Sequence, residues 1–341
     1  MGRKTKHNKL TSPELLAKVN PENLRLRDDF LNYLRSTQKS DGTIYQYQQD
    51  INIFLCWNLE HNNNKVFVDL KKRDVVAFQS WCIYTNGNSP ARVRRIKATL
   101  SSWSNAIEAV MDDEYEDFRP IIRKVESPIN APVLDKTVLS DEQIQLLLDT
   151  LTETGFYDQA CFVALAANSG RRKSELVRFK HEWFTPDNIV FGSLYRTPEK
   201  VQTKGRAGGK YLTCYTLATN FQPYFDRYMQ WRNENGVDSQ WLFYDKKNPS
   251  EQLSTGTVDS WCNKFSRILG VDVYIHSFRH AFTTRLKSAG IPDTVIQKII
   301  GWSSVDMVAI YYDGNDEDEI GMYFGDGGIK TDIKQTQLSD L

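Results

Sequence analysis

The sequence lacks the features of membrane, secreted and zinc-binding proteins. Its longest apolar run, near residues 160–167, is far shorter than the ~18 residues of a membrane-spanning helix. No apolar stretch follows the basic residues 1–10, which argues against a secretory signal. The five cysteines are scattered and form no CxxC pair: Cys56, Cys82, Cys161, Cys214 and Cys262. We therefore expect a protein of the reducing cytoplasm that does not contact membranes.

The sequence also lacks an excess of either charge. Basic and acidic residues both number 43 in a chain of 341 residues, which at first disfavours a nucleic-acid partner. Eleven of the acids, however, lie within residues 112–117 and 313–326, and without them 43 basic residues face 32 acidic ones. Basic clusters occur at residues 3–9, 71–73 and 92–97. The distribution leaves nucleic-acid binding open, although such clusters are often only solvated surfaces.

The first part of the chain has the pattern of a small helical domain. Apolar residues at helical spacing predict amphipathic helices at residues 22–36, 42–60, 73–85 and 89–110. In the last helix the apolar stripe leaves four cations on other faces, and these are the candidate DNA-binding residues: Arg92, Arg94, Arg95 and Lys97. We predict a basic extension over residues 1–20, a helical domain over 21–127 and a proline-containing linker over 128–137.

A second domain is predicted over residues 138–325, followed by a tail over 326–341. It begins with a capping box formed by Ser140 and Gln143. Residues 189–195 and 211–217 are rich in aromatic and β-branched side chains and are predicted strands, joined by a glycine-rich connection at 204–210.

Helices are predicted on either side of these strands. Gly290 ends a helix that begins near His276, Pro292 can lie in the first turn of the next helix, and Gly301 ends that one. A last short helix is predicted to begin at Ser303 or Ser304 and to carry the tyrosine pair, Tyr311 and Tyr312.

Four separated segments carry candidate chemistry: SGRRKSEL at 169–176, TKGRAGGK at 203–210, HSFRH at 276–280 and GWSSVDMVAIYY at 301–312. Arg172 and Glu175 lie three residues apart on a predicted helix, so the carboxylate can orient the guanidinium. His276 and Arg279 have the same spacing. One guanidinium group can bind two phosphate oxygens at once, and a phenol can act as a covalent nucleophile. The set therefore suits phosphoryl transfer.

Each segment alone has a plainer interpretation. An arginine and a glutamate three residues apart are usually a surface ion pair. The glycine-rich segment is not a Walker loop, because Tyr211 replaces the Ser or Thr that would hold magnesium. Trp302 and the tyrosine pair are by default core aromatics.

In order and spacing, the four segments together resemble the tyrosine recombinases, or phage-integrase family. Members carry an arginine in a GxRxSE-like helix, a lysine on a β-hairpin, HxxR, a Gly-His or Gly-Trp pair, and a tyrosine nine residues later. The matching residues are Gly170, Arg172, Ser174, Glu175, Lys204, His276, Arg279, Gly301, Trp302 and Tyr311. Arg171 and Lys173 depart from the pattern, because they replace the usual apolar neighbours of the first arginine. The adjacent Tyr312 could compete with Tyr311 for its role.

The resemblance implies a mainly α fold with a small antiparallel β-sheet, divided into a helical core-binding domain and an α+β catalytic domain. It also implies roles for single residues. Tyr311 would attack a phosphodiester, Arg172 and Arg279 would bind its non-bridging oxygens, and His276 would accept a proton or bind phosphate. Lys204 would be the general acid, with Lys200 and Lys210 as alternatives, Trp302 would support the site, and Glu175 would orient Arg172.

The implied activity is site-specific recombination of double-stranded DNA. Strands would be cut and rejoined through a 3′-phosphotyrosine and a Holliday junction by a homotetramer on two sites, with no metal or other cofactor. Two alternatives stay open: a DNA-relaxing enzyme similar to type IB topoisomerases, and a non-catalytic DNA-binding protein on the same fold. A metal nuclease is disfavoured because no Asp, Glu and His cluster has ligand spacing.

Overall fold

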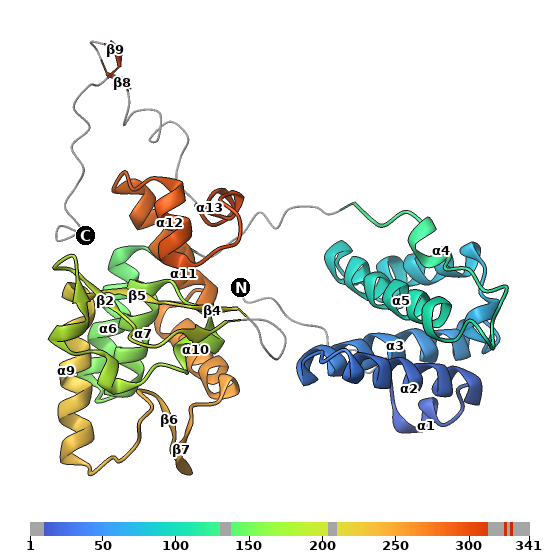
Figure 1. Cartoon of the computed structure of the whole chain (residues 1–341), viewed down its shortest axis with the longest axis horizontal. Coiled ribbons are helices and arrows are strands. Elements are labelled where there is room, and N and C mark those ends of the chain that lie inside the picture. Colours follow the sequence, from blue (N-terminus) through green and yellow to red (C-terminus); the bar gives the residue numbers. More distant parts are fainter. Residues whose placement is uncertain (1–9, 130–137, 204–209, 313–323, 326–327, 330–341) are drawn as a thin grey trace. The chain divides into compact units, whose positions relative to one another are not determined.

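The computed structural model describes residues 10–129, 138–203, 210–312, 324–325 and 328–329. These residues form two compact units, one mostly before residue 134 and the other mostly after residue 135 (Figure 1). Within the described residues, no helix combines the length and the apolar composition needed to cross a membrane. The fold is mainly helical with small antiparallel sheets, as predicted.

The N-terminal unit is built from helices around one apolar core. Its elements are α1 (Pro13–Leu16), α2 (Pro21–Ser36), α3 (Asp41–His61), the 3₁₀ turn η1 (Phe67–Asp69), α4 (Lys72–Ser80), the π-helical turn η2 (Trp81–Thr85), α5 (Pro90–Val110) and the 3₁₀ turn η3 (Ile122–Lys124). Ser40 and Ser89 begin α3 and α5 by accepting a backbone N–H bond with their side chains. The segment predicted as one helix at 73–85 is α-helical only up to Ser80 and becomes π-helical from Trp81.

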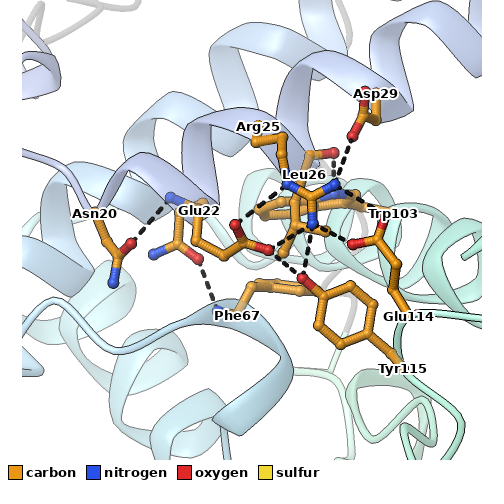
Figure 2. Close-up of polar contacts among 10 residues, drawn as sticks. Asn20, Glu22, Arg25, Leu26, Asp29, Phe67, Trp103, Glu114 and Tyr115 are labelled. Carbon is orange, nitrogen blue, oxygen red and sulfur yellow. Dashed lines mark hydrogen bonds and ion pairs between the residues drawn. The ribbon is translucent and has the colours of Figure 1, made fainter.

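Part of the acidic run at 112–117 is bound to α2 of the same unit (Figure 2). Nη2 of Arg25 donates to Glu22 at 2.7 Å, to Glu114 at 2.5 Å and to the Tyr115 hydroxyl at 3.0 Å. Nearby, the indole N–H of the fully buried Trp103 donates to the Leu26 carbonyl at 3.1 Å. These contacts attach the segment after α5 to α2, so two of the run's residues serve the packing of this unit.

The C-terminal unit is arranged around α7, whose side chains from residue 159 to 169 are all buried. Its helices are α6 (Asp141–Glu153), α7 (Tyr157–Ser169), α8 (Lys173–Leu176), the 3₁₀ turns η4 (His181–Trp183) and η5 (Pro186–Asn188), α9 (Ala218–Glu234), α10 (Thr255–Leu269), α11 (Ile275–Ser288), α12 (Asp293–Ile300) and α13 (Asp306–Tyr311). Helices α6, α9 and α11 pack against α7. Pro292 caps α12 rather than lying within it, and α13 begins at Asp306 rather than at a serine.

All sheets in the described residues are small and antiparallel. The strands are β1 (Ile189–Val190), β2 (Leu194–Arg196), β3 (Val201–Gln202), β4 (Tyr211–Leu212), β5 (Tyr215–Leu217), β6 (Tyr244–Asp245), β7 (Asn248–Gln252), β8 (Phe324–Gly325) and β9 (Gly328–Ile329). The strand order is β1-β2-β5 in one sheet, and β3 pairs with β4, β6 with β7 and β8 with β9.

The two predicted strands are each divided. Residues 189–195 do not form one strand, because Phe191 and Gly192 have positive φ values of 55° and 73° and turn the chain from β1 into β2. The other predicted strand is interrupted between β4 and β5, where the Cys214 carbonyl accepts a bond from the Thr197 N–H at 3.0 Å.

Candidate active site

Arg172 caps α8 directly after α7 ends. Gly170 ends α7 with a φ of 58°, and a side chain there would come within 2.6 Å of Phe282 Cδ1, so both conformation and space favour glycine. The buried Glu175 carboxylate accepts bonds from the Arg172 backbone N–H at 3.1 Å and from its Nη1 at 3.0 Å. One carboxylate thus holds both the backbone and the guanidinium of Arg172, which fixes the direction of the side chain.

Arg279 lies on α11 and is completely buried. Its Nη1 donates to the Gly170 carbonyl at 2.8 Å, while Nε and Nη2 have no hydrogen-bond partner among the described residues. Burial lowers the pKa of Arg279, and the charge of Arg172 lowers it further. Buried donors beside a second cation are costly unless an anion binds to them. Arg172 and Arg279 are therefore suited to hold a phosphate.

His276 precedes Arg279 by one helical turn and has a solvent-accessible side chain. Desolvation by the surrounding protein lowers the pKa of His276, and the charges of Arg279 and Arg172 lower it further. The imidazole is therefore neutral at pH 7 and can accept a proton.

Helices α12 and α13 bring an indole and a phenol to Arg279. Gly301 ends α12 with a φ of 76°, and the buried Trp302 follows directly. The Trp302 ring lies 4.9 Å from Arg279 Cζ and 5.0 Å from the Tyr311 ring centre. The Tyr311 ring lies 5.4 Å from Arg279 Cζ and 6.4 Å from the His276 ring. The two aromatic rings thus both lie beside the Arg279 guanidinium, and the His276 ring lies near that of Tyr311.

The adjacent tyrosine occupies a different environment. The Tyr312 ring lies 5.0 Å from Lys287 Nζ, near the C-terminal end of α11. Tyr312 is the residue that ends α13, and its N–H donates to the Val308 carbonyl at 2.8 Å. Of the two phenols, that of Tyr311 is the one beside Arg279.

Two residues of this site escaped the sequence reasoning. His280 stacks on Tyr311 with ring centres 4.4 Å apart, and its Nδ1 lies 3.0 Å from the Tyr311 carbonyl oxygen. The sequence feature that could have identified His280 is its position four residues after His276, which places both residues on one helix face. Arg171 is buried and donates to the carbonyls at the end of α12. The sequence feature that could have identified Arg171 is a cation at a position next to Arg172 where the family pattern has an apolar residue.

Lys204, the predicted general acid, lies outside the described residues. It directly follows Thr203, whose N–H and hydroxyl both donate to the Lys210 carbonyl at 2.8 Å. Lys200 and Lys210, the alternatives, both have exposed side chains. The choice among the three lysines stays a prediction.

The cations expected to contact DNA belong to the N-terminal unit, on α5. Arg92 and Arg95 form ion pairs with the buried Asp50 carboxylate at 2.6 and 2.9 Å. Arg94 is exposed and donates to the Pro128 carbonyl at 2.9 Å. Arg94, Arg95 and Lys97 also line an open groove of about 610 Å³, together with Arg123, which the sequence analysis did not identify.

Lys97, the fourth candidate DNA-binding residue, has different surroundings from the other three. Its side chain is buried, and its amino group donates to the Val125 carbonyl and to the Ser127 hydroxyl, the latter at 3.0 Å. The segment that contains η3 packs against α5, so a side chain outside the apolar stripe still becomes enclosed. Lys97 thus holds this segment to α5.

The described residues contain no group of three or more His, Cys, Asp or Glu side chains placed to hold a metal ion. The five cysteines are free and buried. Burial raises the pKa of Cys214 to about 11 and that of Cys82 to about 12, so neither thiol is a nucleophile at neutral pH.

Comparison with known families gives two matches in separate parts of the chain. Residues 137–318 match the phage integrase family, and residues 26–116 match the N-terminal SAM-like domain of phage integrases.

Individual relatives are similar over most of the chain. The SPbeta prophage-derived recombinase-like protein YomM of Bacillus subtilis is 29% identical over 273 residues, which is 79% of each chain. The tyrosine recombinase XerA of Pyrococcus furiosus is 26% identical over 288 residues, covering 83% of this chain and 87% of XerA.

Solved structures share the fold at low sequence identity. The XerH site-specific recombinase bound to palindromic difH substrate, in a post-cleavage complex, has a TM-score of 0.63 at 16% identity and covers 87% of this chain and 94% of its own. A lambda integrase tetramer bound to a Holliday junction has a TM-score of 0.62 at 15% identity, with coverages of 85% and 76%.

Proposed function

This chain belongs to the phage integrase family of tyrosine recombinases, and on that premise we propose that Tyr311 is the nucleophile with which it cuts DNA. As a member of that family it is a site-specific DNA recombinase. The observation that carries the proposal is the position of the Tyr311 ring, 5.4 Å from Arg279 Cζ and 5.0 Å from the Trp302 ring.

The proposed reaction exchanges one phosphate ester for another. The phenol oxygen of Tyr311 attacks the scissile phosphorus and its proton passes to His276. The bond between phosphorus and the 5′ oxygen breaks, and that oxygen takes a proton from Lys204. The products are a 3′-phosphotyrosine and a free 5′ hydroxyl. Because the new ester keeps the energy of the old one, no nucleotide is needed, and a second 5′ hydroxyl reverses the step.

Arg172 and Arg279 hold the non-bridging oxygens of that phosphate in the proposed site. Two donors of Arg279, Nε and Nη2, are buried without a partner among the described residues, which supports an anionic ligand. The indole N–H of Trp302 is likewise buried and unpartnered there, so it is a further donor for phosphate. Charge that develops on the oxygens in the transition state is stabilised by donors already in position. Glu175 serves this by orienting Arg172.

Strand cleavage is expected to proceed fully in EDTA and without nucleotide. The reason is that Arg172, Arg279 and Lys204 supply the charge and the proton that a metal ion would otherwise supply. The measurement is trapping of the covalent complex on a nicked suicide substrate, which loses its 5′ hydroxyl fragment and cannot be resealed. Loss of the complex on chelation, with recovery on adding a divalent metal, would contradict the proposed mechanism.

The pH profile of cleavage tests the role of His276. Because its pKa lies below the ordinary 6.5, the imidazole stays neutral to more acidic pH, and the acidic fall in rate is expected below pH 6.5. His276→Gln should lower the rate about tenfold to a hundredfold and remove this fall. His181→Gln is the matched control, because burial also lowers the pKa of His181, which lies on η4. It should keep both the rate and the profile, and a profile that persists in His276→Gln would exclude this imidazole as the proton acceptor.

We also propose that the active assembly is a homotetramer on two double-stranded DNA sites, joined through a Holliday junction. The support is the shared fold with the lambda integrase tetramer on such a junction. Mixing two labelled sites with the protein should yield a complex of four chains and two duplexes by light scattering. A complex that never exceeds one chain per duplex would instead favour a topoisomerase-like activity.

We propose DNA contacts for three cations of α5: Arg92, Arg94 and Arg95. The ion pairs of Arg92 and Arg95 with Asp50 hold their guanidinium groups in place, and the basic groove beside Arg94 supports a backbone contact. Lys97 is left out because its amino group is engaged within the domain. Since the substrate is DNA, we propose a cytoplasmic location.

A further inference from the structure

The most unusual side chain near the site is that of Arg171, which is only 1% exposed. Its Nη2 donates to the Ile299 carbonyl at 2.5 Å and its Nη1 to the Ile300 carbonyl at 3.3 Å. These carbonyls belong to the last turn of α12, where helix carbonyls lack partners of their own and the helix dipole is negative. Arg171 therefore acts as a side-chain cap for α12, although it lies far away in sequence.

This cap connects the segment that carries Arg172 with the segment that carries Gly301 and Trp302. Arg171 directly precedes Arg172, and the capped carbonyls directly precede Gly301 and Trp302. The fit is close at Gly301, where an added side-chain carbon would lie 3.3 Å from Arg171 Nη1 and 2.4 Å from Leu212 Cδ1. One side chain thus links the phosphate-binding arginine to the segment that carries Trp302 and leads to Tyr311.

Capping α12 with a buried arginine costs desolvation free energy that an apolar side chain at position 171 would not. In the part of the chain that the structure describes, Arg171 forms no ion pair with a carboxylate, and its Nε has no hydrogen-bond partner. Burial is the main cause that lowers the pKa of the neighbouring Arg279, and the charges of Arg172 and Arg171 add to it. An apolar side chain would fill the same space without desolvating a charge. The guanidinium fork must therefore contribute something that packing alone does not.

We propose that Arg171 is a positioning residue, which holds the Gly301–Trp302 segment and, through it, Tyr311 at the correct distance from Arg172 and Arg279. The proposal rests on the proposed nucleophile. Misplacing reacting groups by about 1 Å can cost on the order of a hundredfold in rate, so a contact that touches no substrate can still limit the reaction.

The test compares Arg171→Met with Lys173→Met in single-turnover adduct formation at saturating DNA. Lys173 is the matched control because it is the other neighbour of Arg172, and its amino group forms a more exposed ion pair with Asp259 at 2.7 Å. Arg171→Met should slow adduct formation about tenfold or more at unchanged DNA affinity. Lys173→Met should stay within about twofold of the wild-type rate.

Arg171→Lys separates positioning from a general loss of packing. An ammonium can donate to the α12 carbonyls but lacks the fork, so its rate should lie between those of Met and Arg at this position. If Arg171→Met does not fold, Arg171→Lys carries the test alone and should still lose about threefold or more in rate. A wild-type rate per folded molecule in Arg171→Met, or in Arg171→Lys where only that variant folds, would overturn the proposal.

A substrate that is uncharged at the scissile phosphate distinguishes a positional effect of Arg171 from an effect of its charge. A methylphosphonate at the scissile site removes the negative charge that the arginines balance. If Arg171 acts by position, Arg171→Met should be slow on both substrates, whereas recovery on the methylphosphonate would overturn the proposal in favour of a charge effect. Failure of the proposed function has a different signature, because the wild-type protein would then form no adduct at all.

Discussion

Tyr311→Phe is expected to bind its DNA site with unchanged affinity and to form no covalent adduct, whereas Tyr312→Phe should still form it. The change removes one oxygen, which is the attacking atom in the proposed reaction, so the expected loss is complete rather than partial. Tyr311 is the last residue of α13, whereas Tyr312 caps the helix with an extended backbone, and its ring lies by Lys287. The ring beside Arg279 is that of Tyr311.

The pair of variants is its own matched control, since both lose a single hydroxyl from adjacent positions. Denaturing gels of the trapped complex and a gel shift on intact DNA separate chemistry from binding. An adduct in Tyr311→Phe together with none in Tyr312→Phe would move the nucleophile by one residue. It would also show that the spacing from Trp302 does not identify it.

Much of this site could be predicted because its parts are local. Arg172 and Glu175 meet since they lie three residues apart at the start of one helix, and His276 and Arg279 share one turn of α11. The same local rules located Gly301 as the residue that ends α12.

What could not be predicted depends on contacts distant in sequence. The role of Arg171 exists only because α12 ends beside it, and Lys97 is buried only because the segment with η3 packs against α5. The division of the strand at 189–195 was missed for a different reason. An aromatic residue with positive φ, such as Phe191, is rare enough that sequence patterns do not indicate it.

Lys204→Ala is expected to slow cleavage of ordinary DNA on the order of a hundredfold or more, because the departing 5′ oxygen needs a proton that water at neutral pH supplies poorly. A substrate with sulfur in the 5′ bridging position tests this directly, since the thiolate leaves without protonation. On that substrate Lys204→Ala should regain most of the wild-type rate. Tyr311→Phe should gain nothing, because its defect is in attack rather than departure.

Lys200→Ala and Lys210→Ala are the matched controls, since both residues have exposed ammonium groups on the chain that flanks Lys204. Each should cleave both substrates at similar rates if it only binds the DNA backbone. Equal slowing of Lys204→Ala on both substrates would indicate that Lys204 contacts phosphate but does not donate the proton. Recovery with sulfur in Lys200→Ala or Lys210→Ala would assign the general acid to that lysine, because only the proton donor becomes dispensable when the leaving group needs no proton.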